Sequence, residues 1–379
     1  MTKTTVVVTI DGFDPDYLDA CDAPNLQELG RKGFLKIGKS MMPSVTNVNN
    51  VSLVTASYPE VHGVSSNYRM IRETGEEIYM ESGEYILAET MFQRATKLGK
   101  RSVLVTSKDK LRTLLSDGAT ITVSSEQAPE WVVAGPKVGE PPEIYSLEVN
   151  GWSINAANYI MTQHEADLVY ITTTDYAMHT YAPDAPESQQ HITILDNAIG
   201  ELLETHPDTT FLLTADHGMS AKSRLLDLND VLSAHGIRAV QVPIIKDRYV
   251  VHHSNLGGCM FIYMDPEHTG RTDEAMKILR ETPGIDDVYS REGAVEKLNL
   301  YHERIGDIVV TGDKETVFGP SKLSRDLGGD GKVPSGLRSH ASAHEQDIPL
   351  LGYNGDFEGF DFSENRDIGR YVFERTLAD

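Results

Sequence analysis

Residues 4–12 read TTVVVTIDG, a short β-branched run that ends in an aspartate and a glycine. Such a run is typical of a buried strand. Residues 167–175, DLVYITTTD, and residues 209–218, TTFLLTADHG, repeat the arrangement. Because amphipathic helical stretches separate these runs, the sequence predicts an α/β fold with a mostly parallel sheet and crossover helices.

Two segments interrupt this rhythm. Residues 116–149 contain four prolines and little periodicity, and residues 246–334 contain strand-like runs around a helical stretch. Such segments are typical of insertions into a larger fold. We therefore expect a core built from residues 1–115, 150–245 and 335–379. Residues 116–149 and 246–334 are expected to form a smaller α+β cap.

Local signals place further elements in the core. Residues 22–33 are expected to form a helix that Asp22 caps at the start and Gly33 ends. Residues 102–106 read as another strand. Between residues 192 and 202, apolar side chains recur at helical spacing, so one face of that helix is expected to pack on the sheet.

The composition narrows the class of protein. The 379 residues include 57 acidic and 34 basic side chains, a formal net charge of -23, which argues against broad binding to nucleic acid or an anionic membrane. The two cysteines, Cys21 and Cys259, cannot build a disulfide framework or a cysteine-rich metal site. The apolar run near the N-terminus is too short for a signal or transmembrane segment, so we expect a cytoplasmic protein.

Three predicted strands lead into an acidic residue: Asp11, Asp175 and Asp216. The carboxyl ends of parallel strands share one edge, and carboxylates gathered there imply bound cations. His179 follows four residues after Asp175, and His217 directly follows Asp216. These ligand types suit zinc, with Mn²⁺ or Fe²⁺ as alternatives. Either Asp-His pair alone reads more simply as a turn residue beside a surface histidine, but three acidic strand ends together favour a metal site.

A further histidine ligand is expected from residues 337–344, which read LRSHASAH. His340 and His344 are both candidates, and only one is expected to bind metal. The Ser/Ala-rich context before an apolar run indicates a loop rather than a helix.

A nucleophile is suggested by residues 42–54, MPSVTNVNNVSLV, in which Pro43 and Ser44 fit the start of a helix. Thr46 would then lie near the helix N-terminus, where free backbone N–H groups favour a phosphate-like anion. The simpler interpretation is that Ser44 or Thr46 only caps the helix. Beside metal cations, however, the Thr46 hydroxyl would lose its proton readily and become a nucleophile.

These motifs, in this order along nearly the whole chain, resemble the alkaline phosphatase superfamily and, within it, the phosphonoacetate hydrolases. The resemblance implies an alkaline-phosphatase-like core, with helices flanking the sheet and a cap domain made by insertions. It also implies a hydrolase with two Zn²⁺ ions per chain. A homodimer is the assembly that the family suggests.

The resemblance assigns the site residues. It places one zinc ion on Asp11, Thr46, Asp216 and His217, with Thr46 as nucleophile, and the other on Asp175, His179 and His340.

The same resemblance prefers His340 as the distal ligand because Arg338 and Ser339 precede it in the family's register. Where the family has glycine after this histidine, however, the chain has Ala341. His344 is therefore kept as the reserve ligand.

Substrate recognition also follows from the resemblance. Residues 107–111, SKDKL, resemble the element whose lysines receive the carboxylate of phosphonoacetate, which implies this role for Lys108 and Lys110. Residues 66–68, SNY, resemble the element whose asparagine binds a phosphoryl oxygen, which implies Asn67. Without the resemblance, the lysine pair would be interpreted as a solvated helix start.

The implied reaction is hydrolysis of the C–P bond of phosphonoacetate to acetate and phosphate through a phosphothreonine intermediate. The expected partner is a small phosphonate, with neither nucleic acid nor a membrane involved. The alternative is a nucleotide pyrophosphatase or phosphodiesterase of the same superfamily. It would share the metal ligands but need a pocket for a nucleoside or an alkyl ester.

Overall fold

The computed structural model, which describes residues 3–329 and 331–378, places β1 (Thr5–Thr9) in the middle of a seven-stranded sheet. β1 pairs in parallel with β7 (Leu168–Thr172) on one side and with β8 (Thr210–Thr214) on the other. Every residue of these three strands is buried, as their near-continuous apolar runs require.

The strand order is β2-β17-β8-β1-β7-β5-β6. β5 (Ser102–Thr106) and β6 (Ile121–Ser124) continue the parallel part. β17 (Asp347–Tyr353) runs antiparallel to both β8 and β2 (Phe34–Lys39). The sheet is mostly parallel, which confirms the α/β fold class expected from the sequence.

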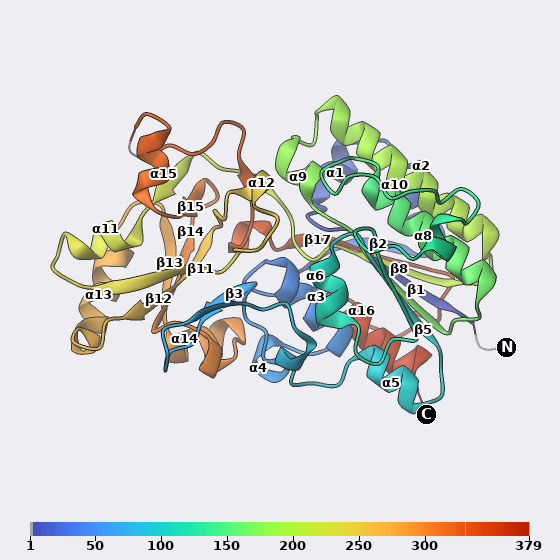
Figure 1. The fold of residues 1–379 in the computed structure, drawn as a ribbon, viewed down its shortest axis with the longest axis horizontal. Helices are drawn as coiled ribbons and strands as arrows, with labels where there is room; N and C mark the ends of the chain where they lie inside the picture. Colours follow the sequence, from blue (N-terminus) through green and yellow to red (C-terminus); the bar gives the residue numbers. More distant parts are fainter. Residues whose placement is uncertain (1–2, 330, 379) are drawn as a thin grey trace.

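Helices cover both faces of this sheet (Figure 1). One face carries α2 (Pro24–Lys32), α8 (Val149–Gln163) and α10 (Pro186–Thr205), and the other carries α3 (Thr46–Thr55) and α16 (Arg366–Tyr371). The main hydrophobic core lies between these helices and the sheet.

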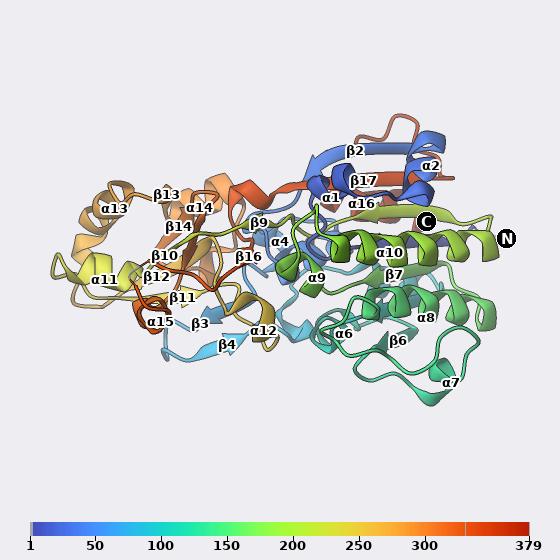
Figure 2. The ribbon, with the colours of Figure 1, turned by 90° about the horizontal axis from the view of Figure 1, so that it is seen from above.

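A second lobe lies beyond the carboxyl ends of the parallel strands (Figures 1 and 2). Its antiparallel sheet has the order β11-β12-β14-β13. One hydrophobic cluster lies within this lobe, and a second packs its strands against Val48 of α3. The strands are β11 (Ala239–Pro243), β12 (Cys259–Met264), β13 (Ile285–Ser290) and β14 (Ile308–Gly312). We call this part the small lobe; the expected domain boundaries themselves stay a prediction.

Shorter elements connect these layers. Three two-stranded ribbons pair β3 (Tyr68–Met70) with β4 (Glu77–Tyr79), β9 (Ser220–Ala221) with β16 (Arg338–Ser339), and β10 (Arg224–Leu226) with β15 (Thr316–Phe318). The remaining α-helices are α1 (Pro15–Ala20), α4 (Pro59–His62), α5 (Met91–Lys97), α6 (Asp109–Leu115), α7 (Glu130–Val133), α9 (Tyr176–Thr180), α11 (Leu228–Ser233), α12 (Val250–His253), α13 (Thr272–Arg280), α14 (Arg291–Leu298) and α15 (Ser321–Asp326).

The structure differs from the sequence-based expectation at three places. Residues 121–124, expected in the cap, form β6 at the edge of the main sheet, and residues 239–243, expected in the core, form β11 of the small lobe. The N-cap of α2 is Ala23 and not Asp22. The carboxylate of Asp196 on α10 instead accepts hydrogen bonds from the backbone N–H groups at the start of α2, so a tertiary contact replaces the local cap.

Across the part of the chain that the structure describes, no helix combines the length and apolarity needed to cross a bilayer.

Candidate metal centre

The three acidic strand ends meet at one edge of the main sheet. Thr9 at the end of β1 pairs with Thr172 of β7 and with Thr214 of β8, so these strands end level with one another. Asp11, Asp175 and Asp216 follow them and are all buried. Level strand ends therefore produce the expected cluster of carboxylates.

One group of potential ligands consists of Asp11, Asp216 and His217, whose ligand atoms all lie within 4.8 Å of one another. His217 Nε2 is 3.3 Å from Asp11 Oδ1 and 3.6 Å from Asp216 Oδ2. Thr46 is the first residue of α3, and its Oγ1 lies 3.4 Å from His217 Nε2. The hydroxyl thus points at this group from a helix N-terminus.

A second group lies around Asp175. His179 Nε2 is 2.9 Å from Asp175 Oδ2, and His340 Nε2 is 3.8 Å from the same oxygen. The His340 ring stacks on His217 with 3.5 Å between the centroids, which joins the two groups. The structure thus brings together the residues that the resemblance assigned to two adjacent zinc ions, and their roles as ligands remain a proposal.

His344 lies away from both groups. Its side chain is 37% exposed and pairs with Asp286 at 2.7 Å.

The three histidines share one orientation: each has its Nδ1 next to a backbone carbonyl oxygen, so Nε2 faces the carboxylates. The contacts are His179 with Arg338 O (2.6 Å), His217 with Gly218 O (3.0 Å) and His340 with Ser44 O (2.6 Å). A carbonyl bonded to one ring nitrogen leaves the other as a metal ligand. In addition, Asp11 Oδ1 is buried without a hydrogen-bond partner among the described residues. These features fit divalent cations bound to oxygen and nitrogen donors.

The electrostatics of the cluster point the same way. Burial and the neighbouring carboxylates of Asp175 and Asp216 raise the pKa of Asp11 well above its usual range. Burial raises the pKa of Asp216 to about 6. Burial lowers the pKa of His217 and, together with the adjacent imidazoles, holds that of His340 well below its usual range. Bound cations would relieve the repulsion between the carboxylates and favour the neutral imidazoles.

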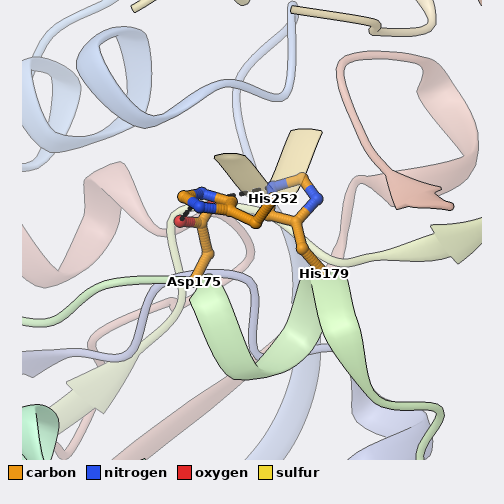
Figure 3. A group of neighbouring side chains, drawn as sticks. All are labelled: Asp175, His179 and His252. Atoms are coloured by element: carbon orange, nitrogen blue, oxygen red, sulfur yellow. Dashed lines mark hydrogen bonds and ion pairs between the residues drawn. The ribbon is translucent and has the colours of Figure 1, made fainter. Parts of the chain in front are cut away.

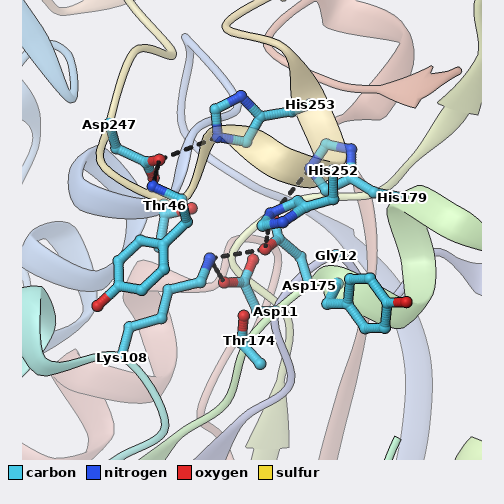
Figure 4. A network of polar contacts seen from close by, with 12 residues as sticks. Asp11, Gly12, Thr46, Lys108, Thr174, Asp175, His179, Asp247, His252 and His253 are labelled. Carbon is cyan, nitrogen blue, oxygen red and sulfur yellow. Dashed lines mark hydrogen bonds and ion pairs between the residues drawn. The ribbon is translucent and has the colours of Figure 1, made fainter. Parts of the chain in front are cut away.

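Lys108 lies inside the cluster (Figure 4). Its Nζ is 2.9 Å from Asp11 Oδ2 and 2.6 Å from Asp175 Oδ1, and its side chain is 1% exposed. Although burial opposes the charge, Asp11 and Asp175 hold the pKa of Lys108 well above its usual range. Burial alone would raise the pKa of Asp175, but Lys108 and His179 hold it well below its usual range. Lys108 thus supplies a fixed positive charge beside both groups.

The other two residues implied in substrate binding border the same site. Lys110 is buried and forms an ion pair with Asp247. Asn67 accepts a hydrogen bond from the backbone N–H of Asn47, the second residue of α3, at 3.0 Å. Its amide therefore lies next to the helix turn that carries Thr46.

Sequence reasoning missed three residues of the network: Asp247, His252 and His253. They belong to the segment around α12, which joins β11 to β12 in the small lobe. Asp247 Oδ1 is 2.9 Å from His253 Nε2, and His252 Nε2 is 3.2 Å from Asp175 Oδ1. Two adjacent histidines in the sequence could have indicated a site in this segment. Only the tertiary fold, however, brings the segment to the edge of the main sheet.

The sequence of the chain matches a family model. The match to the type I phosphodiesterase / nucleotide pyrophosphatase family covers residues 5–332. The chain belongs to this family. It is therefore a hydrolase of the alkaline phosphatase superfamily.

Curated relatives are similar in sequence to part of this chain. A Schizosaccharomyces pombe protein described as an uncharacterized pyrophosphatase/phosphodiesterase is 26% identical over 263 residues, which are 62% of this chain and 49% of that protein. The venom phosphodiesterase of Naja atra is 23% identical over 231 residues, 58% of this chain and 26% of the venom protein. The chain thus spans about half the length, or less, of these two relatives.

Solved structures of the family extend the likeness to both lobes. Phosphonoacetate hydrolase of Sinorhizobium meliloti 1021, solved with phosphonoacetate and with phosphonoformate, is 31% identical with a TM-score of 0.88. That alignment covers 99% of this chain and 96% of the other. Murine ectonucleotide pyrophosphatase/phosphodiesterase 5 is 18% identical with a TM-score of 0.72, over 100% of this chain and 96% of the murine chain. At this identity the likeness shows the shared fold alone. The chain is thus a phosphonoacetate-hydrolase-like member of its family.

Proposed function

We propose that this protein hydrolyses the C–P bond of phosphonoacetate to acetate and phosphate, with two divalent cations, zinc in the first place, and Thr46 as nucleophile. The observation that carries the proposal is the pair of buried ammonium groups of Lys108 and Lys110 beside the Asp/His groups. A phosphonate with a second acidic group gives both charges a function. The 31% identity to a phosphonoacetate hydrolase supports the same substrate.

The cations would be held by the two groups of ligands. Asp11, Thr46, Asp216 and His217 would hold one, and Asp175, His179 and His340 the other. When bound, such cations stabilise charge on phosphoryl oxygens and make an adjacent hydroxyl or water a stronger nucleophile.

Thr46 is placed for attack on phosphorus. As the first residue of α3, it lies where backbone N–H groups have no partner within the helix and can hold phosphonyl oxygens. Asn67 next to this turn would donate its amide to the same oxygens. The Thr46 oxygen forms a bond to phosphorus as the C–P bond breaks, and water later hydrolyses the phosphothreonine.

The leaving group is the difficult part of this reaction. The electron pair of the C–P bond moves onto carbon and then onto the substrate carboxylate as an enediolate, which takes up a proton to become acetate. Lys108 and Lys110 would place positive charge where this negative charge develops, and such stabilisation lowers the barrier when it is stronger in the transition state than in the ground state. This requirement would give the two buried lysines a catalytic function.

A nucleotide pyrophosphatase or phosphodiesterase is the second candidate. The family model and the curated relatives favour it, since their descriptions name these activities. It would use the same metal ligands and the same threonine. The two lysines would then contribute less to catalysis, because the leaving group of a phosphodiester has no carboxylate for them to bind.

The decisive assay measures release of acetate and phosphate from phosphonoacetate, with and without a chelator. We expect the chelator or Thr46→Ala to abolish release. The control Thr55→Ala, at the other end of α3, should retain it. Full activity of the Thr46 variant would refute the nucleophile. Fewer than about two zinc-like ions per active chain would refute the two-metal site.

Substrate profiling separates the two candidates. Lys108→Met and Lys110→Met should abolish phosphonoacetate turnover and reduce hydrolysis of an aryl phosphodiester much less, at unchanged metal content. Lys97→Met, which removes an exposed ammonium group, is the control. Equal losses on both substrates, or a phosphodiester turned over far faster by the wild type, would favour the second candidate.

A further inference from the structure

Two adjacent histidines on α12, His252 and His253, have different surroundings. His253 Nε2 bonds Asp247 Oδ1 at 2.9 Å, and His253 Nδ1 accepts the backbone N–H of Asn255 at 2.9 Å. Both of its ring nitrogens are therefore used within the small lobe. Neither ring nitrogen of His252 has a hydrogen-bond partner among the described residues. His253 has a structural role, whereas the nitrogens of His252 are left available.

His252 points into the cluster around Asp175 (Figure 3). Its side chain is 1% exposed, and its Nε2 lies 3.2 Å from Asp175 Oδ1 without the alignment of a hydrogen bond. Its ring centroid lies 4.8 Å from that of His179. One ligand atom from each of Asp175, His179 and His252 lies within 4.8 Å of the others. The three donors can therefore share one ion.

The ring is fixed by its neighbours. Tyr145 and Tyr176 make edge contacts with His252 at centroid distances of 5.7 Å and 6.1 Å. These contacts hold the ring in place, and neither nitrogen has a hydrogen-bond partner in the part of the chain that the structure describes. Burial of an unpartnered polar group costs free energy, and such a group in a native structure often marks an unseen ion or a catalytic role.

We propose that His252 is a further protein ligand of the cation bound by Asp175 and His179. The inference rests on the two-metal site of the proposed function and adds a donor from the small lobe to a site otherwise built on the core. One carboxylate and several imidazoles are donors that zinc accepts readily. Through His252, the cation would join the α12 segment to the main sheet.

The test uses the full-length chain stripped of metal and reloaded with zinc. In wild-type protein labelled with ¹⁵N-histidine, four ring nitrogens, those of His179, His217, His252 and His340, should move to zinc-bound chemical shifts. His252→Gln should bind two zinc ions but raise one dissociation constant at least tenfold, on the scale of losses seen when the surroundings of a metal site are disturbed. The control His344→Gln, an exposed histidine outside the site, should leave both constants unchanged.

Each outcome decides the inference. Three zinc-shifted histidines with His252 absent from them would overturn it, even if the Gln variant failed to fold, because that measurement needs only the wild type. Unchanged zinc affinity in a folded His252→Gln variant would overturn it as well. In both cases a wild type that binds two zinc ions leaves the proposed function standing. A wild type that binds fewer than two would refute the proposed function and this inference with it.

Discussion

The ion pair between Lys222 and Glu345 gives a stability prediction that can be worked from the structure. Both side chains are fully buried, with Lys222 Nζ 2.9 Å from Glu345 Oε1. Glu345 Oε2 also accepts hydrogen bonds from the Ser342 hydroxyl at 2.7 Å and from its backbone N–H at 3.0 Å. The Ser44 hydroxyl donates a hydrogen bond to the Ser342 carbonyl oxygen, and the Ser44 carbonyl oxygen accepts one from His340 Nδ1. The pair thus anchors the loop that carries His340.

Replacement of Lys222 with Met would leave a buried carboxylate without its counter-charge. Removal of one partner of a buried pair costs about 3 to 5 kcal/mol. Burial alone would raise the pKa of Glu345, but Lys222 and the Ser220 and Ser342 hydroxyls hold it below its usual value. The stabilisation of the wild type is therefore present above the unfolded-state pKa and lost as pH falls through the lower folded-state pKa.

In the Met variant, the pKa of Glu345 should rise, because burial then lacks compensation. The carboxyl can take up a proton in acid, so the free-energy cost of the variant should be greatest near pH 8 and smaller near pH 5. Urea unfolding followed by circular dichroism, in the presence of a chelator, measures this cost at both pH values. The double variant Lys222→Met with Glu345→Gln should recover part of the loss.

The exposed pair of Lys97 and Glu89 provides the control. Lys97→Met should change the free energy of unfolding by less than about 1 kcal/mol, because surface ion pairs contribute little. A cost below about 1 kcal/mol for Lys222→Met at pH 8, or a cost equal at both pH values, would refute the reasoning.

Three further predictions follow from the site. Ala341 is buried at a φ of 91°, so Ala341→Val should lower the free energy of unfolding by about 2 kcal/mol or more. Ala341→Gly should change it by no more than about 1 kcal/mol, because relief of backbone strain offsets the lost methyl contact. Equal melting temperatures for the Val variant and the wild type would contradict this. Asp247→Asn should raise the KM for phosphonoacetate on the order of tenfold, because Lys110 loses the carboxylate that positions it, and an unchanged KM would exclude this role. The zinc affinity of the metal-free protein should rise as pH increases through about 6. The reason is that burial raises the pKa of Asp216 to about 6 and a carboxylate must lose its proton to bind the metal. Titration against a chromophoric chelator measures this affinity, and an affinity that stays constant between pH 5 and pH 7 would contradict the prediction.

The parts of the site that the sequence could predict are those fixed by local chain geometry. A β-branched run followed by aspartate places a carboxylate at a strand end, and parallel strands bring such ends together without further information. Asp11, Asp175 and Asp216 therefore lie close enough to interact electrostatically, as expected. His179 could be anticipated in the same way, since it follows Asp175 by one turn of α9.

The remaining parts depend on tertiary contacts that leave no periodic signal. His252 reaches Asp175 because the α12 segment folds back from the small lobe onto the main sheet edge. The choice between His340 and His344 depends on the loop after β16, where the Ser44 carbonyl meets His340 Nδ1. The start of α2 differs from its sequence signal because a carboxylate from α10 replaces the local cap. In each case, the decisive partner lies far away in the sequence.

The charge of the site bears on the choice between phosphonoacetate and a simple phosphodiester as substrate. With every group counted in its ionised form, the carboxylates of Asp11, Asp175, Asp216 and Asp247 and the ammonium groups of Lys108 and Lys110 together carry a formal charge of -2. Two divalent cations would change this local net charge from -2 to +2, on a chain whose formal net charge is -23. A simple alkyl or aryl phosphodiester offers one ionised oxygen to such a site, whereas phosphonoacetate offers a phosphonate and a carboxylate. An unpaired charge is costly in a buried site. Phosphonoacetate, which carries more negative charge than a simple phosphodiester, therefore matches this site better.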